Sequence, residues 1–291
     1  MESVAAEGIV EEVHRAALMA DSSALEGLAH SLQEQIEKEV APVGALSAEL
    51  ALVESVLFRH HTGSPDSLKR ARAALLVAES SRATPESELA LAEGALRWAE
   101  GDGAAAKAAL MRAPSDSLLR ARIATEIALE AGDPAEAEAA WISPDSPASA
   151  PWLASLGPGV AALMDGPAAA AAAAAGLKGL GDVALVPVLA EGWTGAPPAA
   201  RLKAINALLQ RAPSLPIQQT ARLQAARALL LLELQRSGAA TVAADSVRAA
   251  PQSAEAWHAA GVISLHEGRV QKALESFEAC AGARPAGAVC A

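Results

Sequence analysis

The chain has 291 residues, of which 52% are hydrophobic, 20% are charged and only 2% are aromatic. Its formal net charge of -11 at pH 7 argues against binding to nucleic acid or to an anionic membrane through general electrostatic attraction. About a quarter of the residues are alanine, the strongest helix former, so the composition favours an all-α fold of closely packed helices.

The start of the chain and its apolar runs bear on the compartment. The first residues lack the basic segment followed by an apolar core that marks a secretory signal peptide. The longest apolar candidates, residues 168–177 and 183–190, are shorter than the roughly 20 residues that a membrane-spanning helix needs. We therefore expect a cytoplasmic protein without membrane insertion, or a periplasmic one if the chain is a fragment that lacks its signal.

Residues 1–81 are predicted to form two helical hairpins. The first pair is 2–19 and 22–40, and its second helix carries an apolar stripe at helical spacing, Leu25, Leu28, Leu32 and Ile36. A third helix with a stripe from Leu46 to Leu57 is expected to end at His60-His61, and a fourth is expected to run from Ser64-Pro65 to about Ser81. The first 40 residues hold nine Asp or Glu against two basic residues, which we interpret as a solvated helix face rather than a docking site for a basic partner.

Residues 82–150 are expected to form two more regular hairpins. Thr84 is predicted to cap a helix that has Pro85 at its first position. The second of these hairpins places residues 118–131 before the turn Gly132-Asp-Pro, and Ala137 and Trp141 follow the glycine at five and nine residues.

Residues 151–213 are the least regular part of the chain. Gly157-Pro-Gly159 is interpreted as a break inside a helix pair. The turn at Gly166 follows Gly132 after 34 residues (166 minus 132), which indicates a repeat.

The clearest motif lies between Pro251 and Pro285. Trp257 and Gly261 are four residues apart, and Gly268 follows seven residues later. Ala273, Phe277 and Cys280 lie five, nine and twelve residues after Gly268. This spacing predicts a helix, a tight glycine turn, a second helix and a proline stop, with a small residue where the helices approach each other.

The pattern resembles the tetratricopeptide (TPR) repeat, which combines a Trp, a small residue, a turn glycine, an alanine, an aromatic residue and a proline in about 34 residues. The resemblance is specific in about 250–285, fair in 86–141 and only architectural elsewhere, and residues 151–213 resemble a HEAT-type helix pair equally well. It implies an all-α, right-handed superhelical solenoid of about eight hairpins. We divide the chain into segments of different character: 1–81, 82–150, 151–213 and 214–291.

The resemblance also implies a concave groove, lined by the first helix of each hairpin, that takes peptides or partner helices. In the family register, the groove residues would be Arg122, Ile123, Glu126, Leu129, His258, Val262, Leu265 and His266. The Lys/Asn set by which chaperone-binding members of the family hold a terminal carboxylate is absent from both helices, so a cochaperone of that type is disfavoured. An apolar floor with charged edges suits an amphipathic helix or an extended segment.

No enzyme motif stands out, and we expect neither a cofactor nor a metal. Residues 176–181 contain glycines and a lysine but lack the spacing of a phosphate-binding loop. His60 and His61 would point about 100° apart on a helix, so we interpret them as a polar helix end rather than a metal site. Trp152 and Trp193 are either core residues or part of a pocket. A disulfide between Cys280 and Cys290 is possible, but nothing in the sequence requires it.

Two functional hypotheses follow. The first is a non-catalytic adaptor or scaffold that binds a protein partner, and the second is a regulatory or accessory domain of a larger enzyme or signalling protein. An enzyme that uses the Trp152–Trp193 region is a third and weaker possibility. Only residues 281–291 follow the last predicted helix, which leaves an edge that a second copy of the chain, as a homodimer, or further protein would cover. We expect Leu274 and Phe277 to be covered within their own repeat.

Overall fold

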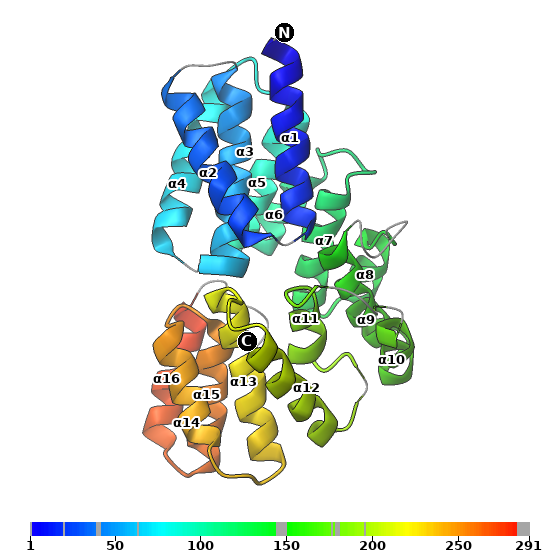
Figure 1. Cartoon of the computed structure of the whole chain (residues 1–291), viewed down its shortest axis with the longest axis vertical. Coiled ribbons are helices and arrows are strands. Elements are labelled where there is room, and N and C mark those ends of the chain that lie inside the picture. Colours follow the sequence, from blue (N-terminus) through cyan, green and yellow to red (C-terminus); the bar gives the residue numbers. More distant parts are fainter. Residues whose placement is uncertain are drawn as a thin grey trace. The chain divides into compact units, whose positions relative to one another are not determined.

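The computed structural model is all-helical, as the composition and periodicity predict. It describes residues 2–19, 21–38, 42–62, 64–143, 150–175, 177, 181–194 and 196–283. Over these residues it contains sixteen α-helices, one π-helical turn and no β-strand (Figure 1). The predicted all-α fold class is confirmed, while the solenoid arrangement stays a prediction.

The helices follow each other with short connections. The first half contains α1 (Glu2–Met19), α2 (Ser22–Glu37), α3 (Val43–Leu57), the π-helical turn η1 (Phe58–Thr62), α4 (Pro65–Ser80), α5 (Glu86–Ala99), α6 (Gly103–Leu110), α7 (Leu118–Ala131) and α8 (Pro134–Ala140). The second half contains α9 (Pro151–Asp165), α10 (Pro167–Ala175), α11 (Leu185–Ala190), α12 (Pro198–Arg211), α13 (Ile217–Glu233), α14 (Ala239–Ala249), α15 (Ala254–His266) and α16 (Val270–Gly282).

The residues group into two compact units. The N-terminal unit comprises residues 1–127 and 140–153, and the C-terminal unit comprises residues 128–139 and 154–291. The four segments proposed from the sequence differ from these units in their boundaries and remain a description of sequence character.

Several helices begin where the sequence places a capping side chain. The Asp21 carboxylate accepts a hydrogen bond from the Ala24 amide at 3.0 Å, and the Ser64 hydroxyl accepts one from the Asp66 amide at 3.4 Å. The prediction for Thr84 is wrong, because its hydroxyl donates to the Ala78 carbonyl at 2.7 Å and does not cap α5. Pro85 takes the cap position of α5 without a side-chain hydrogen bond.

The turn glycines predicted from the sequence have left-handed backbone conformations. Gly132 has φ of +66°, and Gly268 has φ of +74°. Side chains with a Cβ rarely adopt these angles, so a glycine allows the chain to reverse there at little cost. The predicted turn at Gly166 and the turn at Gly238, which precedes α14, have the same property.

In the N-terminal unit, α3 is the central helix. It contacts α4, α5, α2 and α1, and every residue from Gly44 to Leu57 is buried. Apolar side chains of α1 to α7 join in one hydrophobic cluster around it. Figure 1 shows α2, α3 and α4 running side by side.

In the C-terminal unit, α13 to α16 pack as two consecutive hairpins. The helices α13 and α14 contact each other, as do α15 and α16, and α15 also contacts both helices of the preceding hairpin. A Cβ at Gly261 would lie 2.6 Å from the Phe277 ring, so the glycine allows α15 and α16 to approach as the motif predicts. Cys280 is disulfide-bonded, and Cys290, the only other cysteine of the chain, lies outside the described residues.

The predicted break at Gly157-Pro-Gly159 is wrong. The helix α9 runs from Pro151 to Asp165 with Pro158 inside it. A Cβ at Gly159 would lie 2.7 Å from the ring of Trp193, so this glycine makes room for a half-buried tryptophan. Trp152, at the start of the same helix, is fully buried.

Among the helices of the described part of the chain, none is both long and apolar enough to cross a membrane.

Candidate functional site

Three of the predicted groove residues are buried, which corrects the assignment of α7 to an open groove wall. Arg122 and Ile123 are completely inaccessible, and Glu126 is nearly so. Leu129 is half-buried. The register of the TPR resemblance assigned these residues to the groove, but the opposite charges of Arg122 and Glu126, four residues apart, pair inside the protein.

Glu126 is the centre of a buried polar cluster in the N-terminal unit. Its Oε1 accepts a hydrogen bond from Arg122 Nε at 3.2 Å and another from Trp152 Nε1 at 2.6 Å. Its Oε2 lies 3.2 Å from Nε2 of His60. Arg122 also donates to the Ala17 carbonyl at the end of α1. The cluster therefore connects α1, η1, α7 and the start of α9.

Aromatic rings surround these charges. The His60 ring lies 4.5 Å from the ring of Trp152 and 5.1 Å from that of Trp98, measured between centroids. The Arg122 guanidinium lies 5.0 Å from the centre of the Trp152 ring, and that of Arg59 lies 4.6 Å from the centre of the Trp98 ring. Both distances allow cation–π attraction.

The pKa shifts of the cluster show what it can do chemically. Burial alone would raise the pKa of Glu126, but His60, Arg122 and Arg59 around it outweigh this effect, and its pKa is lowered. Burial lowers the pKa of His60 to about 4, so the imidazole is neutral at pH 7. A permanently ionised carboxylate with three neighbouring N–H groups is a poor proton acceptor, and the cluster is therefore suited to holding helices together.

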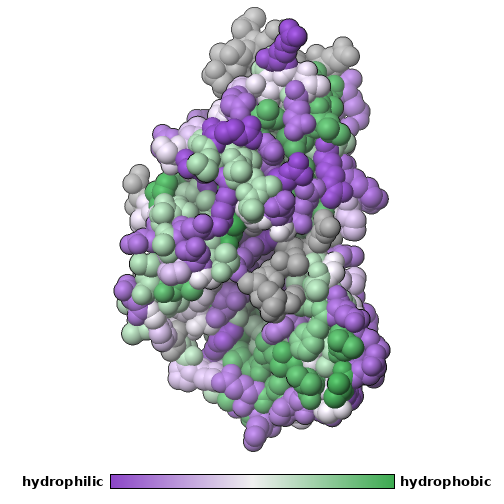
Figure 2. All heavy atoms as spheres, turned by 180° about the vertical axis from the view of Figure 1, so that it is seen from behind, coloured by the Kyte–Doolittle hydropathy of each residue, from purple (hydrophilic) through white to green (hydrophobic). Residues whose placement is uncertain are grey.

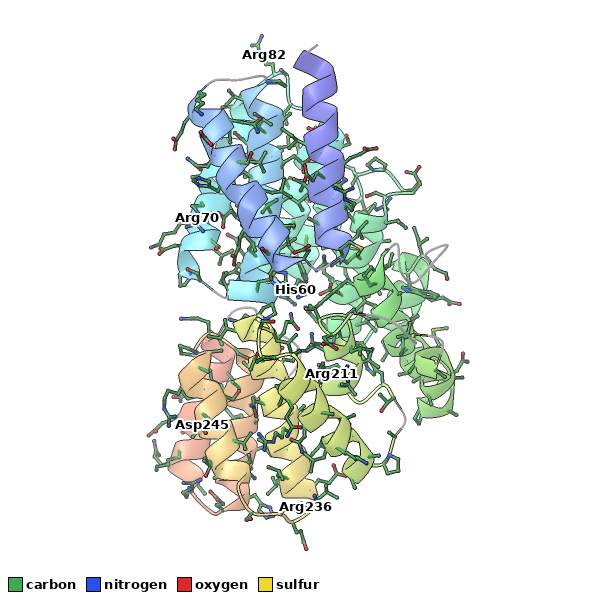
Figure 3. All side chains as sticks on the ribbon, viewed as in Figure 1. His60, Arg70, Arg82, Arg211, Arg236 and Asp245 are labelled. Atoms are coloured by element: carbon green, nitrogen blue, oxygen red, sulfur yellow. The ribbon has the colours of Figure 1, made fainter. Side chains whose placement is uncertain are left out.

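His60 and His61, interpreted from the sequence as a polar helix end, are not at an exposed end. Both lie in the π-helical turn η1 and are buried. Burial lowers the pKa of His61 to about 3. Figure 3 shows His60 in η1, at one end of the N-terminal unit. In the parts of the chain that the structure describes, no group of three His, Cys, Asp or Glu is placed to hold a metal ion.

Of the predicted groove residues of α15, two are exposed and two are half-buried. Leu265 and His266 are exposed, and Val262 is half-buried. His258 is half-buried, and its ring lies 6.1 Å from that of Phe277 on α16. Burial lowers the pKa of His258. His258 therefore packs inside the last hairpin as well as bordering its surface.

The last hairpin carries an exposed apolar surface. Leu265, Val270 and Leu274 are 55%, 65% and 51% exposed, and we call them the C-terminal apolar patch. Val270 and Leu274 share a face of α16 with Phe277, and Leu265 lies one turn after Gly261, which faces the Phe277 ring. The expectation that Leu274 is covered by its own repeat is wrong, while Phe277 is half-buried. Figure 2 shows hydrophobic side chains gathered over part of the C-terminal unit, in the lower part of the view.

Each unit contains a surface groove that is bordered by three consecutive helices. The larger is about 740 Å³ and lies between α2 and α4, with α3 as its floor. The smaller is about 390 Å³ and lies between α14 and α16, with α15 as its floor. In both, the second helices of consecutive hairpins are the walls and the helix between them in sequence is the floor.

A second cluster of titratable residues lies in the N-terminal unit. It consists of His14 on α1, Glu49 on α3 and Glu88 on α5. His14 Nε2 is 3.7 Å from Oε2 of the buried Glu49, and Glu88 is close enough to influence both. Burial and the Glu49 charge raise the pKa of Glu88 to about 6. Burial alone would lower the pKa of His14, but Glu49 and Glu88 outweigh it, and the pKa is raised.

These shifts predict that Glu88→Gln stabilises the protein near pH 8 and not near pH 4.5. A carboxyl whose pKa is raised in the folded state costs stability once pH exceeds its unfolded value of about 4.5, and this cost is complete above about 6. Because Glu88 is partly exposed, solvent screening limits the expected gain to about 1 kcal/mol. Urea denaturation of the variant and the natural protein at both pH values measures it.

The raised pKa of His14 also makes the natural protein less stable as pH rises. The charged form of His14 stabilises the fold at low pH, and this contribution is lost when the imidazole loses its proton. The exposed Glu12→Gln on the same helix serves as the control and should have no such pH dependence. A gain for Glu88→Gln that is equal at pH 4.5 and pH 8 would contradict the prediction.

No protein-family model matches the sequence, and a comparison with curated proteins finds no match either.

Proposed function

We propose that this chain is a non-catalytic adaptor or scaffold of TPR-like helical hairpins, arranged as a right-handed solenoid, that binds a segment of a partner protein. The observation that carries the proposal is the C-terminal apolar patch, Leu265, Val270 and Leu274. Three large aliphatic side chains within ten residues remain in water although their hairpin already has a packed interior. Such a patch is favourable only when another surface covers it.

The order of contacts supports the repeat part of the proposal. In α1 to α6 and in α11 to α16, a helix contacts its hairpin partner, and neighbouring hairpins contact each other, as α13, α14 and α15 do. Glycines with positive φ stand at turns that the motif predicts, and Gly261 faces Phe277 at the helix crossing. Each hairpin of a solenoid buries its apolar side on the next, so apolar side chains that stay exposed on a hairpin suit contact with another surface.

The buried cluster around Glu126 favours a binding role over a catalytic one. Glu126 is held ionised by paired donors, and His60 beside it is neutral, so neither is poised to exchange a proton near pH 7. The predicted groove residues Arg122, Ile123 and Glu126 are replaced in this proposal by the C-terminal apolar patch, of which Leu265 was already a predicted contact.

We expect the triple variant Leu265→Glu, Val270→Glu and Leu274→Glu to lose partner binding by at least tenfold, which corresponds to about 1.4 kcal/mol. The introduced carboxylates would have to be desolvated on binding, while in the free protein they face water, so the fold should be retained. The partner is identified by affinity capture from extract of the native cell. Isothermal titration with that purified partner then measures the affinity.

The matched control carries Leu76→Glu and Met111→Glu, which replace similarly exposed aliphatic side chains of the N-terminal unit. It should bind as the natural protein does. Instead of a partner, a second copy of the chain could cover the patch. Sedimentation velocity of the natural protein, the triple variant and the control tests this, because such a dimer would be lost only in the triple variant. If the triple variant binds the captured partner at full affinity and sediments unchanged, the patch is not the binding surface.

A further inference from the structure

The groove between α2 and α4 has a lining that points to an occupant. Three stripes at helical spacing border it: Glu26, Ala29 and Gln33 on α2, Ser47, Leu50 and Leu57 on α3, and Ala73, Ala74 and Val77 on α4. The stripe on α3 covers the eleven residues from Ser47 to Leu57, which is a rise of about 15 Å at 1.5 Å per residue. The hollow is thus an open trough as long as three helical turns.

A buried polar atom in the floor has no partner. The Ser47 hydroxyl lines the groove, its residue is 1% exposed, and it forms no hydrogen bond with any described residue. Buried hydroxyls are normally paired, so an unpaired one that borders an open groove indicates a polar group supplied from outside. Ser47 is independent of the apolar lining and of the charges at the rim.

The rim of the groove is unequally charged. Arg70 on α4, labelled in Figure 3, is held by the buried Glu54 of the floor, with its Nη2 2.9 Å from Oε2. This pair neutralises the basic charge of the α4 wall. Glu26 on the α2 wall makes no ion pair with another described residue, and the other titratable residue of that wall is His30. With histidine counted as neutral, the charge left over at the rim is negative. A ligand with a basic flank facing α2 complements it.

The walls also select the backbone conformation of the ligand. The backbone groups of α2, α3 and α4 are hydrogen-bonded within their helices, so an extended segment would find no main-chain partners in the trough. A helical ligand satisfies its own backbone. The small side chains Ala73 and Ala74 on one wall let such a helix approach closely.

We propose that the α2–α4 groove binds a basic amphipathic helix of a partner protein, about three turns long. Its small apolar face, with one polar side chain over Ser47, lies on α3 and α4, and its Lys or Arg flank lies beside Glu26. The inference rests on the proposed function as a protein-binding repeat module and adds a second surface, distinct from the C-terminal apolar patch, together with the chemistry of its ligand.

The test uses a fluorescent 14-residue probe peptide with an Ala/Leu face, a central Gln in that face and a Lys flank. Fluorescence anisotropy with the full chain should show saturable binding at micromolar concentrations. Ala73→Glu and Val77→Glu, each at an exposed position of the groove, should each weaken binding at least tenfold. Leu76→Glu, the neighbouring exposed position of α4 outside the groove, should leave it unchanged.

Charge selection is tested with Glu26→Lys and with a second probe in which Glu replaces every Lys. The Lys probe should bind the variant at least fivefold more weakly, whereas Glu79→Lys on the exposed side of α4 should have no effect. The Glu probe should bind the natural protein at least tenfold more weakly than the Lys probe. Equal binding of the two probes, equal effects of Val77→Glu and Leu76→Glu, or absence of binding at millimolar probe would each overturn the proposal.

The C-terminal triple variant keeps the two proposals separate. It should bind the Lys probe as the natural protein does, because it leaves the α2–α4 groove intact. Loss of probe binding there would place the ligand on the apolar patch and overturn the groove assignment. Failure of the groove with a patch that still binds its captured partner would leave the proposed function standing.

Discussion

Replacing Glu126 by alanine is expected to lower the free energy of unfolding by about 3–5 kcal/mol. The change leaves the Arg122 guanidinium buried without its counter-charge, and it removes the acceptor of the Trp152 indole N–H. An uncompensated buried charge is costly because the interior cannot replace the water that solvated it. Urea denaturation followed by tryptophan fluorescence measures the loss, since Trp98 and Trp152 both border the cluster.

The double variant Arg122→Met with Glu126→Leu separates loss of the pair from loss of one partner. It removes both charges together, so we expect it to recover most of the stability. The exposed Glu12→Ala on α1 is the control for loss of a carboxylate and should change stability by less than about 0.5 kcal/mol. If Glu126→Ala costs no more than this control, the cluster does not hold the N-terminal unit together.

The second large effect is expected from Gly261→Val, which should destabilise the C-terminal unit by about 1–3 kcal/mol. The Cβ of any replacement would lie 2.6–2.9 Å from three atoms of the Phe277 ring, closer than packed carbon atoms approach. The ring or the helix must therefore move. Thermal unfolding followed by circular dichroism, compared with urea denaturation, measures the change.

A compensating substitution tests the cause. Phe277→Leu in the Gly261→Val background shortens the side chain that the new methyl groups meet, and we expect it to restore part of the stability. Gly282→Ala, where a Cβ would meet nothing within 4 Å, is the matched control. A cost of Gly261→Val that is the same with Phe277 and with Leu at position 277 would show that the strain lies elsewhere.

Local sequence signals predicted the helices well. The helix start at Ser64, the glycine turns and the small residue Gly261 each depend on neighbours in the chain or within one hairpin. The break at Pro158 was wrongly predicted, because a proline usually interrupts a helix. In the structure, α9 continues through it and Gly159 packs under Trp193, a contact that local rules do not include.

The buried polar cluster could not be predicted in the same way. His60, Glu126 and Trp152 are far apart in sequence, and their burial depends on how the hairpins stack. The opposite charges of Arg122 and Glu126, four residues apart on one face of α7, were the available signal. The register of the TPR resemblance instead assigned both residues to an open groove, although paired opposite charges can also be buried.

The burial of α3 from Gly44 to Leu57 also has a consequence for amide hydrogen exchange. Its backbone hydrogen bonds are covered by α2, which precedes it, and by α4 and α5, which follow it. Solvent deuterium reaches the amides of Leu50 to Val53 only when helices on both sides have separated. These amides should therefore be the slowest to exchange in the N-terminal unit, and their protection should report the free energy of opening the whole unit.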